Sequence, residues 1–166
     1  VVLPRRGGDT EFTNLYAAYD ALPAATRQRI DKLRGIHSIS KLRNPCAVIS
    51  GQRDGAAEFY ARQDAEFPSS RHPMVRTHPE TGRKLLYLSP RFTIGVDGLD
   101  DADGQALLDE LFAHQLQPEF RYRHRWRSGD LVIWDNRAVN HRACGGYDDD
   151  DIRLMHRTTV LGDAPY

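Results

Sequence analysis

Apolar residues recur at helical spacing near the start of the chain. Between residues 14 and 33 they repeat every three or four positions, with an interruption at Pro23. Asn14 precedes the first of them, where a side-chain oxygen can cap a helix, and Gly35 follows the last as a stop signal. The pattern predicts two short helices with inward positions at Leu15, Ala18, Tyr19, Leu22, Ile30 and Leu33.

A second helical pattern spans residues 100–117. Its apolar stripe consists of Leu107, Leu108, Leu111, Phe112 and Leu116. Pro118 follows directly, and proline ends a helix because it lacks a backbone N–H and clashes with the preceding turn. We expect an amphipathic helix with one face packed against the body of the protein.

Most of the other apolar residues lie in short runs separated by turn residues. MVRTH, PETGRK and LLYLS predict a β-hairpin in which Pro79 and Gly82 form the turn. FRYRHRW, LVIWD and RLMHRTTVLGD are further predicted strands. Strands spaced about eight to twelve residues apart are typical of a barrel or sandwich. The predicted fold is one domain, mainly β with flanking helices.

Residues 36–71 show a weaker pattern than the rest of the chain. This segment is polar, interrupted by proline and glycine, and only loosely helical around residues 55–66. Long segments without clear structure inside a compact domain are usually functional loops or insertions. We therefore expect a mobile lid or insertion here.

Composition narrows the classes of partner. The chain is 40% hydrophobic and 28% charged, as in ordinary globular proteins, and its 23 basic residues balance 23 acidic ones. No overall field then favours nucleic acid or an anionic membrane, and no apolar run approaches the roughly 18 to 20 residues that span a bilayer. Cys46 and Cys144 lack the spacing of a zinc knuckle or disulfide framework. We expect a cytoplasmic protein without nucleic-acid or membrane partners, and a homo-oligomer is compatible with the sequence.

Two charged stretches have alternative interpretations. In FRYRHRWR the aromatic residues alternate with arginines, as in a nucleic-acid-binding stripe or in a half-buried strand. The balanced total charge favours the strand. The aspartates at 148–151 lack the DxDxDG pattern of a calcium loop, so we expect a solvated loop.

Candidate chemistry is concentrated near the end of the chain. His141 lies in WDNRAVNHRA, just after a predicted turn, where a histidine is more often a hydrogen-bonded residue than a metal ligand. Arg153 and Arg157 stand four apart in an alternating run and so share a face, with Met155 between them. Arginines on an inward face need an anion, and guanidinium groups match carboxylates. The pattern favours an anionic ligand; the alternative is that both arginines pair with acidic neighbours.

Several stretches carry a resemblance to a known family. They are GGDTEF, AAYDALP, HPMVRTHPETGRKLLYLS, and PEFRYRHRWRSGDLVIWDNRAVNHRA followed by RLMHRTTVLGD. Together they resemble the TauD/TfdA family of Fe(II)- and 2-oxoglutarate-dependent dioxygenases, above all its 2,4-dichlorophenoxyacetate dioxygenase branch and then taurine dioxygenase. The resemblance covers the chain except residues 36–71. It implies that residues 1–166 are the C-terminal part of a dioxygenase with a double-stranded β-helix (jelly-roll) core.

The same resemblance implies roles for individual residues. His141 matches the distal histidine of the 2-His-1-carboxylate iron site, an arrangement that leaves coordination positions open for 2-oxoglutarate and O2. Arg153 and Thr10 match the pair that binds the far carboxylate of 2-oxoglutarate, and Arg157 matches the arginine that holds the acidic end of the primary substrate. Trp134 matches a tryptophan near the iron, with core packing as the alternative.

Two departures from the family pattern bear on these roles. The step from His141 to Arg153 is one residue longer than the family leads us to expect, although the spacing from Arg153 to Arg157 is kept. The first two iron ligands of the family, an HxD pair, do not occur in this sequence. We expect the chain to be part of a longer enzyme; the alternative is a non-catalytic module that binds small anions.

The activity implied is hydroxylation of a small anionic organic substrate with O2, while 2-oxoglutarate is decarboxylated to succinate and CO2. Phenoxyalkanoate-like acids are the first substrate class to expect. Taurine, other alkylsulfonates and sulfate esters are the second.

Overall fold

The computed structural model describes residues 1–39, 56–162, 164 and 165, with only the backbone of residues 56–60. Helices and strands alternate irregularly along the chain. In chain order the elements are β1 (Thr10–Asn14), α1 (Leu15–Asp20), α2 (Ala24–Ile30), β2 (Arg34–His37), α4 (Ala56–Glu66), β3 (Ser70–Pro73), β4 (Val75–Thr77), β5 (Lys84–Leu86), β6 (Thr93–Val96), α5 (Asp101–Gln115), the 3-10 helix η3 (Pro118–Phe120), β7 (Arg121–His124) and β8 (Val139–Ala143). None of the described helices combines the length and apolar character needed to cross a membrane.

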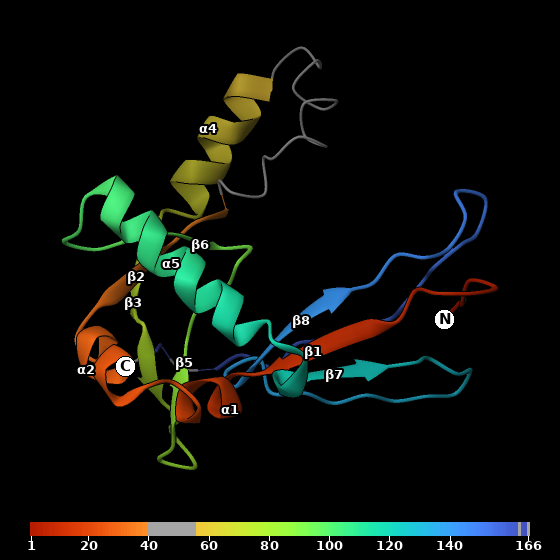
Figure 1. Ribbon diagram of the computed structural model, residues 1–166. Coiled ribbons are helices and arrows are strands. Elements are labelled where there is room, and N and C mark those ends of the chain that lie inside the picture. The colour runs from red at the N-terminus through yellow and green to blue at the C-terminus, as the bar shows by residue number, and fades with distance from the viewer. Residues whose placement is uncertain (40–55, 163, 166) are drawn as a thin grey trace.

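Antiparallel pairing joins strands that are distant in sequence. β1 lies between β7 and β8, and its residue Phe12 stands opposite Tyr122 on one side and His141 on the other. β2 lies between β3 and β6, and β4 pairs with β5. Figure 1 shows β1, β7 and β8 running side by side away from the end of the molecule that holds α1 and α2. The structure confirms the prediction of a mainly β architecture with helices.

The two short helices predicted near the start of the chain are confirmed as α1 and α2. Asn14 caps α1, because its side-chain oxygen accepts the N–H groups of Tyr16 and Ala17, each at 3.1 Å. Leu15 and Ala18 are buried on the inward face of α1, and the helix lies against β5. The strand β1 therefore passes directly into a helix that anchors it to the core.

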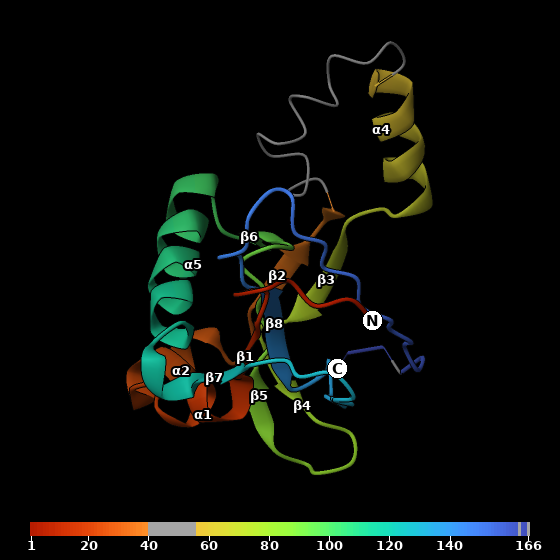
Figure 2. The same cartoon turned by 90° about the vertical axis from the view of Figure 1, so that its right-hand side faces the viewer.

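The long helix α5 confirms the second helical pattern. Asp100 caps it by accepting the N–H of Asp103 at 2.8 Å. The helix lies along β6 and contributes most of its stripe to the main core (Figures 1 and 2). Leu116, at the C-terminal cap, is 38% exposed, so the buried stripe ends one turn earlier than predicted. The core combines Leu86, Leu88 and Val96 with Leu107, Leu108 and Leu111.

The predicted hairpin is also confirmed, as β4 and β5. Gly82 lies in its turn with a φ of 67°, a left-handed conformation that glycine adopts without steric cost. Opposite residues of the hairpin share a face. Val75 and Leu86 face the main core, whereas Arg76 and Leu85 face the other side.

Two runs predicted as strands are not strands in the structure. Residues 131–135 (LVIWD) have no regular secondary structure, and in the run 153–162 only Leu154 pairs, through one bridge to Val2. No described strand pairs with either run, and a strand exists only where a neighbour receives its backbone hydrogen bonds. The strand predictions for these runs are therefore wrong, because alternation shows suitability for a sheet but not the presence of a partner. Their apolar side chains are exposed: Leu131 85%, Ile133 88%, Val160 91% and Leu161 96%.

The predicted insertion at residues 36–71 is bounded more narrowly in the structure. Ile36 pairs with Arg71 and His37 with Ser70, so both ends of the segment belong to the β2–β3 pair. Strands this short and polar produce no clear alternation, which is why the sequence did not reveal them. The helical tendency near residues 55–66 is confirmed as α4, which stands apart from the other elements in both views (Figures 1 and 2). Residues 40–55, which include Cys46, lie outside the described residues, and the lid stays a prediction.

The arginine-rich strand β7 is paired within the protein. Arg121 Nη1 lies 3.3 Å from Glu11 Oε1, and Arg123 Nε lies 2.7 Å from Asp9 Oδ2. These ion pairs favour the strand interpretation over a nucleic-acid stripe. The aromatic side is less buried than predicted, since Tyr122 is 63% exposed and no described element covers it.

The aspartate run at 148–151 is not simply solvated. Asp148 pairs with Arg6 at 2.7 Å, and Asp151 pairs with Arg5 at 2.8 Å. The side chain of Asp151 is only 8% exposed. The run therefore ties the loop before Leu154 to the segment that precedes β1, because two arginines meet it there.

Candidate functional site

His141 lies in the middle of β8 and is held by aromatic rings. Its ring centroid is 5.0 Å from that of Trp134 and 6.2 Å from that of Phe12, the residue opposite it on β1. Partial burial of the imidazole lowers the pKa of His141, and the positive charges of Arg157 and Arg91 lower it further. The ring is thus neutral near pH 7, with a lone pair available to a metal ion.

A cavity of about 890 Å³ opens beside His141. Its charged lining consists of Arg91, Arg142 and Arg157 with Glu11 and Glu66. Arg142 is paired with Glu11 at 2.9 Å, whereas neither Arg91 nor Arg157 forms an ion pair with a described carboxylate, and these two guanidinium groups beside a neutral imidazole favour an anionic occupant. Three rings line it too: His37 on β2, His72 on β3, and Tyr87 just after β5.

Arg153 meets Thr10 rather than the cavity. Its Nη2 donates to Thr10 Oγ1 at 3.3 Å and its Nε donates to the carbonyl oxygen of Gly8 at 2.7 Å. The Oγ1 of Thr10 also accepts Trp126 Nε1 at 2.9 Å. Gly8 has a φ of 69°, and a Cβ there would lie 2.7 Å from Pro4 Cγ. Glycine is therefore required where the backbone turns its carbonyl toward Arg153.

The sheet register relates the two groups of residues. Thr10 and Phe12 are two positions apart on β1 and so point to the same face. Phe12 pairs with His141 and Thr10 pairs with Ala143, which places Thr10 and His141 on that same face as well. The Thr10–Arg153 contact and the His141 imidazole are thus neighbours on one sheet, although only His141 is among the residues that line the cavity.

The proposed anion-binding arginines have no acidic partner among the described residues. Neither Arg153 nor Arg157 forms an ion pair with a described carboxylate. The alternative that both pair with acidic neighbours is therefore not supported by the described part of the chain. Arg153 and Met155 are half-buried while Arg157 is exposed, so the inward direction predicted for the two arginines holds for Arg153 only.

Trp134 combines packing with contact to the candidate ligand. Its ring lies 5.5 Å from Phe12 as well as 5.0 Å from His141, and its Nε1 donates to Asn136 Oδ1 at 2.7 Å. The packing alternative for Trp134 is thus visible in the structure. Its place beside His141 is equally compatible with a role next to a metal.

The described residues supply only part of a metal centre. Among the described residues no group of three His, Cys, Asp or Glu side chains could hold a metal ion. His141 fits the chemistry of one iron ligand, since its imidazole is neutral and borders the cavity. The Thr10–Arg153 contact offers a hydroxyl and a guanidinium that suit a carboxylate.

The structure adds cavity residues that the sequence did not reveal. His37 stacks on Tyr87 with centroids 5.8 Å apart and meets His72 edge-on at 5.1 Å. Burial, followed by the neighbouring His72, lowers the pKa of His37 to about 4. His37 lies near the start of the predicted insertion and His72 lies directly after its end, and only the β2–β3 pairing brings them together. Arg91 follows a proline in a loop and carries no signal in the sequence.

Comparison with known proteins identifies relatives along almost the whole chain. The family model described as "Taurine catabolism dioxygenase TauD, TfdA family" matches residues 1–159. An α-ketoglutarate-dependent 2,4-dichlorophenoxyacetate dioxygenase of Cupriavidus pinatubonensis is 43% identical over 164 residues, which are 99% of this chain and 54% of that protein. An α-ketoglutarate-dependent sulfate ester dioxygenase of Pseudomonas putida is 37% identical over 169 residues, 99% of this chain and 54% of that protein.

A solved structure agrees with these matches. The crystal structure of AAD-2 in complex with Mn(II) and N-oxalylglycine superimposes with a TM-score of 0.83 at 37% sequence identity, covering 99% of this chain and 61% of that one. The chain spans about half the length of the relatives that it matches. The resemblance drawn from the sequence motifs is confirmed.

Proposed function

The chain belongs to the TauD/TfdA family of dioxygenases, and from this membership we propose that the protein is an Fe(II)- and 2-oxoglutarate-dependent dioxygenase that hydroxylates a small anionic organic substrate. The observation that carries the proposal is that His141 and Arg157 line one cavity. A neutral imidazole is an iron ligand, and a guanidinium pairs with an acid group. The cavity can therefore hold an anionic substrate beside a metal.

The iron site requires ligands beyond His141. A single imidazole provides neither the charge nor the geometry that retains Fe(II). Because the chain spans about half of its relatives, we propose that an HxD pair in a part of the protein outside this chain supplies the histidine and the carboxylate. Fe(II) bound with 2-oxoglutarate would supply the activation of O2, with release of succinate and CO2. Trp134 and Phe12 would restrict the orientation of the His141 ring.

We propose that Arg153 and Thr10 hold the far carboxylate of 2-oxoglutarate. Their contact of 3.3 Å places a guanidinium and a hydroxyl side by side, and no described carboxylate neutralises Arg153. Charge-assisted hydrogen bonds from a guanidinium are among the strongest that a carboxylate can accept. Thr10 also shares a sheet face with His141, which suits a co-substrate that reaches from Arg153 to the metal. For the complete protein we propose the double-stranded β-helix that this family resemblance implies, and a cytoplasmic location stays a prediction.

Two substrate classes suit the cavity. The relative from Cupriavidus pinatubonensis is named for 2,4-dichlorophenoxyacetate, so a phenoxyalkanoate-like acid is our first proposal. The relative from Pseudomonas putida is named for sulfate esters, which makes sulfate esters and alkylsulfonates the second. Both classes present an anionic group for Arg157 and an organic part for the ring-lined wall. Succinate release measured over aryloxy acids, alkylsulfonates and sulfate esters would distinguish them.

The metal assignment is tested by replacing His141 in the protein at its natural length. His141→Ala should abolish substrate-dependent succinate formation and weaken Mn(II) binding, while the exposed control His156→Ala should retain both. Undiminished turnover in His141→Ala would refute the assignment. The non-catalytic alternative predicts that the native protein has a mass near 18.9 kDa and releases no succinate with any substrate.

A further inference from the structure

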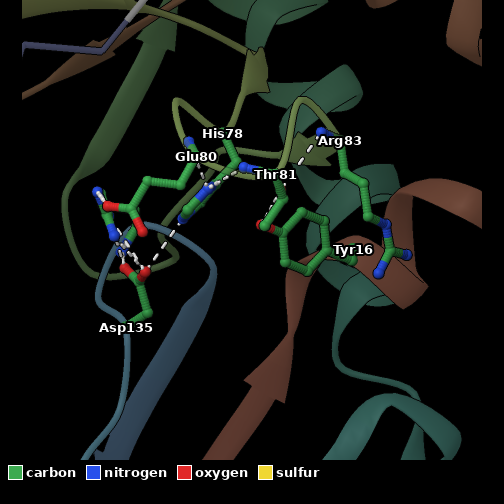
Figure 3. A network of polar contacts seen from close by, with 7 residues as sticks. Tyr16, His78, Glu80, Thr81, Arg83 and Asp135 are labelled. Atoms are coloured by element: carbon green, nitrogen blue, oxygen red, sulfur yellow. Dashed lines mark hydrogen bonds and ion pairs between the residues drawn. The ribbon is translucent and has the colours of Figure 1, made fainter.

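A buried histidine outside the cavity connects two segments that are distant in sequence. His78 follows β4 at the start of the hairpin turn and is 3% exposed. Its backbone N–H donates to the carbonyl oxygen of Arg83 at 2.9 Å, which closes the hairpin. Its ring lies between the hairpin turn and Asp135, as Figure 3 shows. His78 is absent from the residues that line the cavity.

The contacts of the His78 ring define which nitrogen carries hydrogen. Nδ1 faces the backbone N–H groups of Glu80 and Thr81, each at 3.3 Å, so Nδ1 acts as the acceptor. The hydrogen then lies on Nε2, which donates to Asp135 Oδ2 at 3.0 Å. The ring thus bridges the hairpin turn and the carboxylate.

Asp135 is the first residue of the turn that leads into β8. Its backbone carbonyl accepts the N–H groups of Ala138 and Val139 at 3.0 and 3.1 Å. Its carboxylate also accepts Arg137 Nε at 2.9 Å and Nη2 at 2.7 Å. Hydrogen bonds from Arg137, and then from His78, hold the pKa of Asp135 well below its usual range. The carboxylate is therefore ionised near neutral pH, where it accepts these hydrogen bonds.

The position of this turn decides where the His141 imidazole points. Val139, the first residue of β8, stands opposite Asn14, and His141 stands opposite Phe12. Side chains of a strand alternate between faces, so a shift of one residue in register would turn His141 to the other face. The described contacts anchor the turn in three ways: through the carboxylate of Asp135, through Arg137 Nη1, which donates to Glu80 Oε1 at 2.9 Å, and through the Ala138 carbonyl, which accepts the N–H of Leu15 at 3.1 Å. Only the first of these involves His78.

We propose that His78 is a positioning residue of the iron site: through Asp135 it fixes the turn that sets the register of β8 and thereby the orientation of His141. The inference rests on the proposed role of His141 as a metal ligand. His78 itself touches neither substrate nor metal. Partners that orient a metal ligand without binding the metal usually affect metal affinity about 10- to 100-fold when they are lost.

Two substitutions separate the hydrogen bonds at Nδ1 from the hydrogen bond at Nε2. In His78→Gln the side-chain amide nitrogen can take the place of Nε2 and donate to Asp135. In His78→Asn the shorter amide can take the place of Nδ1 and accept from Glu80 and Thr81, but it cannot reach Asp135. Tyr16→Phe is the matched control, because it removes the 3.0 Å hydrogen bond between the Tyr16 hydroxyl and Thr81 Oγ1 in the same hairpin turn without involving Asp135 (Figure 3).

Three measurements on the protein at its natural length test the proposal: Mn(II) affinity in the presence of 2-oxoglutarate, amide hydrogen exchange over residues 135–141, and thermal unfolding. His78→Asn should weaken Mn(II) binding at least about tenfold and accelerate exchange at Ala138 and Val139. His78→Gln should restore both to within about twofold of the unsubstituted protein, and Tyr16→Phe should leave both unchanged.

The outcomes distinguish this inference from the proposed function. If His78→Asn lowers the unfolding temperature but leaves exchange and Mn(II) affinity unchanged, His78 is a structural residue only and the inference is overturned. If His78→Gln restores neither Mn(II) affinity nor slow amide exchange, the hydrogen bond donated to Asp135 does not explain the effect of His78→Asn. The inference is then overturned as well. If the unsubstituted protein does not bind Mn(II), the proposed function fails, while the exchange data still decide whether His78 fixes the turn.

Discussion

Arg153 donates a hydrogen bond from Nη2 to the hydroxyl of Thr10 at 3.3 Å, although 143 residues separate them. If this pair holds 2-oxoglutarate, Arg153→Ala should raise the apparent KM for 2-oxoglutarate at least about 30-fold, since losing a buried charge-assisted pair costs roughly 2 to 5 kcal/mol. Thr10→Val should also raise the apparent KM for 2-oxoglutarate, but by a smaller factor, because it removes a neutral hydrogen bond. Steady-state kinetics with 2-oxoglutarate varied at saturating primary substrate measures both, and an unchanged KM in Arg153→Ala would contradict the assignment.

Arg157 should affect the other substrate. Arg157→Ala is expected to impair kcat/KM for the primary substrate by a comparable factor while the KM for 2-oxoglutarate stays near its original value. Arg157→Lys should restore activity only in part, because an ammonium group cannot reproduce the paired donors of a guanidinium. The reverse pattern, in which Arg157→Ala weakens 2-oxoglutarate alone, would show that the longer step from His141 shifts the two roles.

The buried ring of His37 should make stability depend on pH. Burial and His72 lower its pKa from 6.5 to about 4. Between these values the unfolded chain takes up a proton that the folded chain does not, so stability is complete above pH 6.5 and decreases as the pH falls toward 4. His72 and His141, whose pKa values are also lowered, act in the same direction.

His37→Gln removes this titration and should therefore reduce the loss of stability on acidification. Urea unfolding of both proteins at about pH 7, 6 and 5 measures the free energy of unfolding against pH. Parallel curves for the two proteins would show that His37 does not contribute to the pH dependence.

The contribution of the Asn14 cap of α1 to the free energy of unfolding should be measurable by itself. Asn14 accepts two backbone N–H groups at 3.1 Å, so Asn14→Ala should lower the free energy of unfolding by about 1 kcal/mol. Asn14→Asp retains a carboxylate oxygen at the same place and should lose much less. Urea denaturation of the three proteins tests this, and equal losses in both variants would mean that capping is not the cause.

Two leucines of α5 provide a matched pair for packing. Leu111 is fully buried, whereas Leu116 is 38% exposed. Leu111→Ala should cost about 2 to 5 kcal/mol because it leaves a cavity in the main core, and Leu116→Ala should cost less than about 1 kcal/mol. Thermal and urea unfolding compare the two, and similar costs would refute the assigned end of the buried stripe.

Local patterns in the sequence predicted the elements that depend on neighbours along the chain. The helices α1, α2 and α5, the cap at Asn14 and the β4–β5 hairpin were predictable, because hydrogen bonds a few residues apart and one apolar face determine them. The WDNRAVNHRA stretch and the alternation around residues 153–157 likewise predicted His141, Arg153 and Arg157 as candidate site residues, and the family resemblance implied their roles.

Only the tertiary structure decided which residues meet. Alternation suggested strands at residues 131–135 and 153–162, but pairing depends on a partner elsewhere in space, and no described strand pairs with them. The converse holds for β2 and β3, whose short polar sequences lack a pattern yet pair in register. The contact of His37 with His72 follows from that pairing alone.

In the candidate site, too, the sequence determined some features and the tertiary structure decided others. The sequence by itself determined its reactive groups, because an imidazole and two guanidinium groups have their chemistry wherever they lie. Folding decided that Arg157 shares a cavity with His141, that Arg153 meets Thr10, and that His78 reaches Asp135 over a separation of 57 residues. Distances between side chains depend on strand register and packing across the whole chain, and no local pattern in a sequence contains that information.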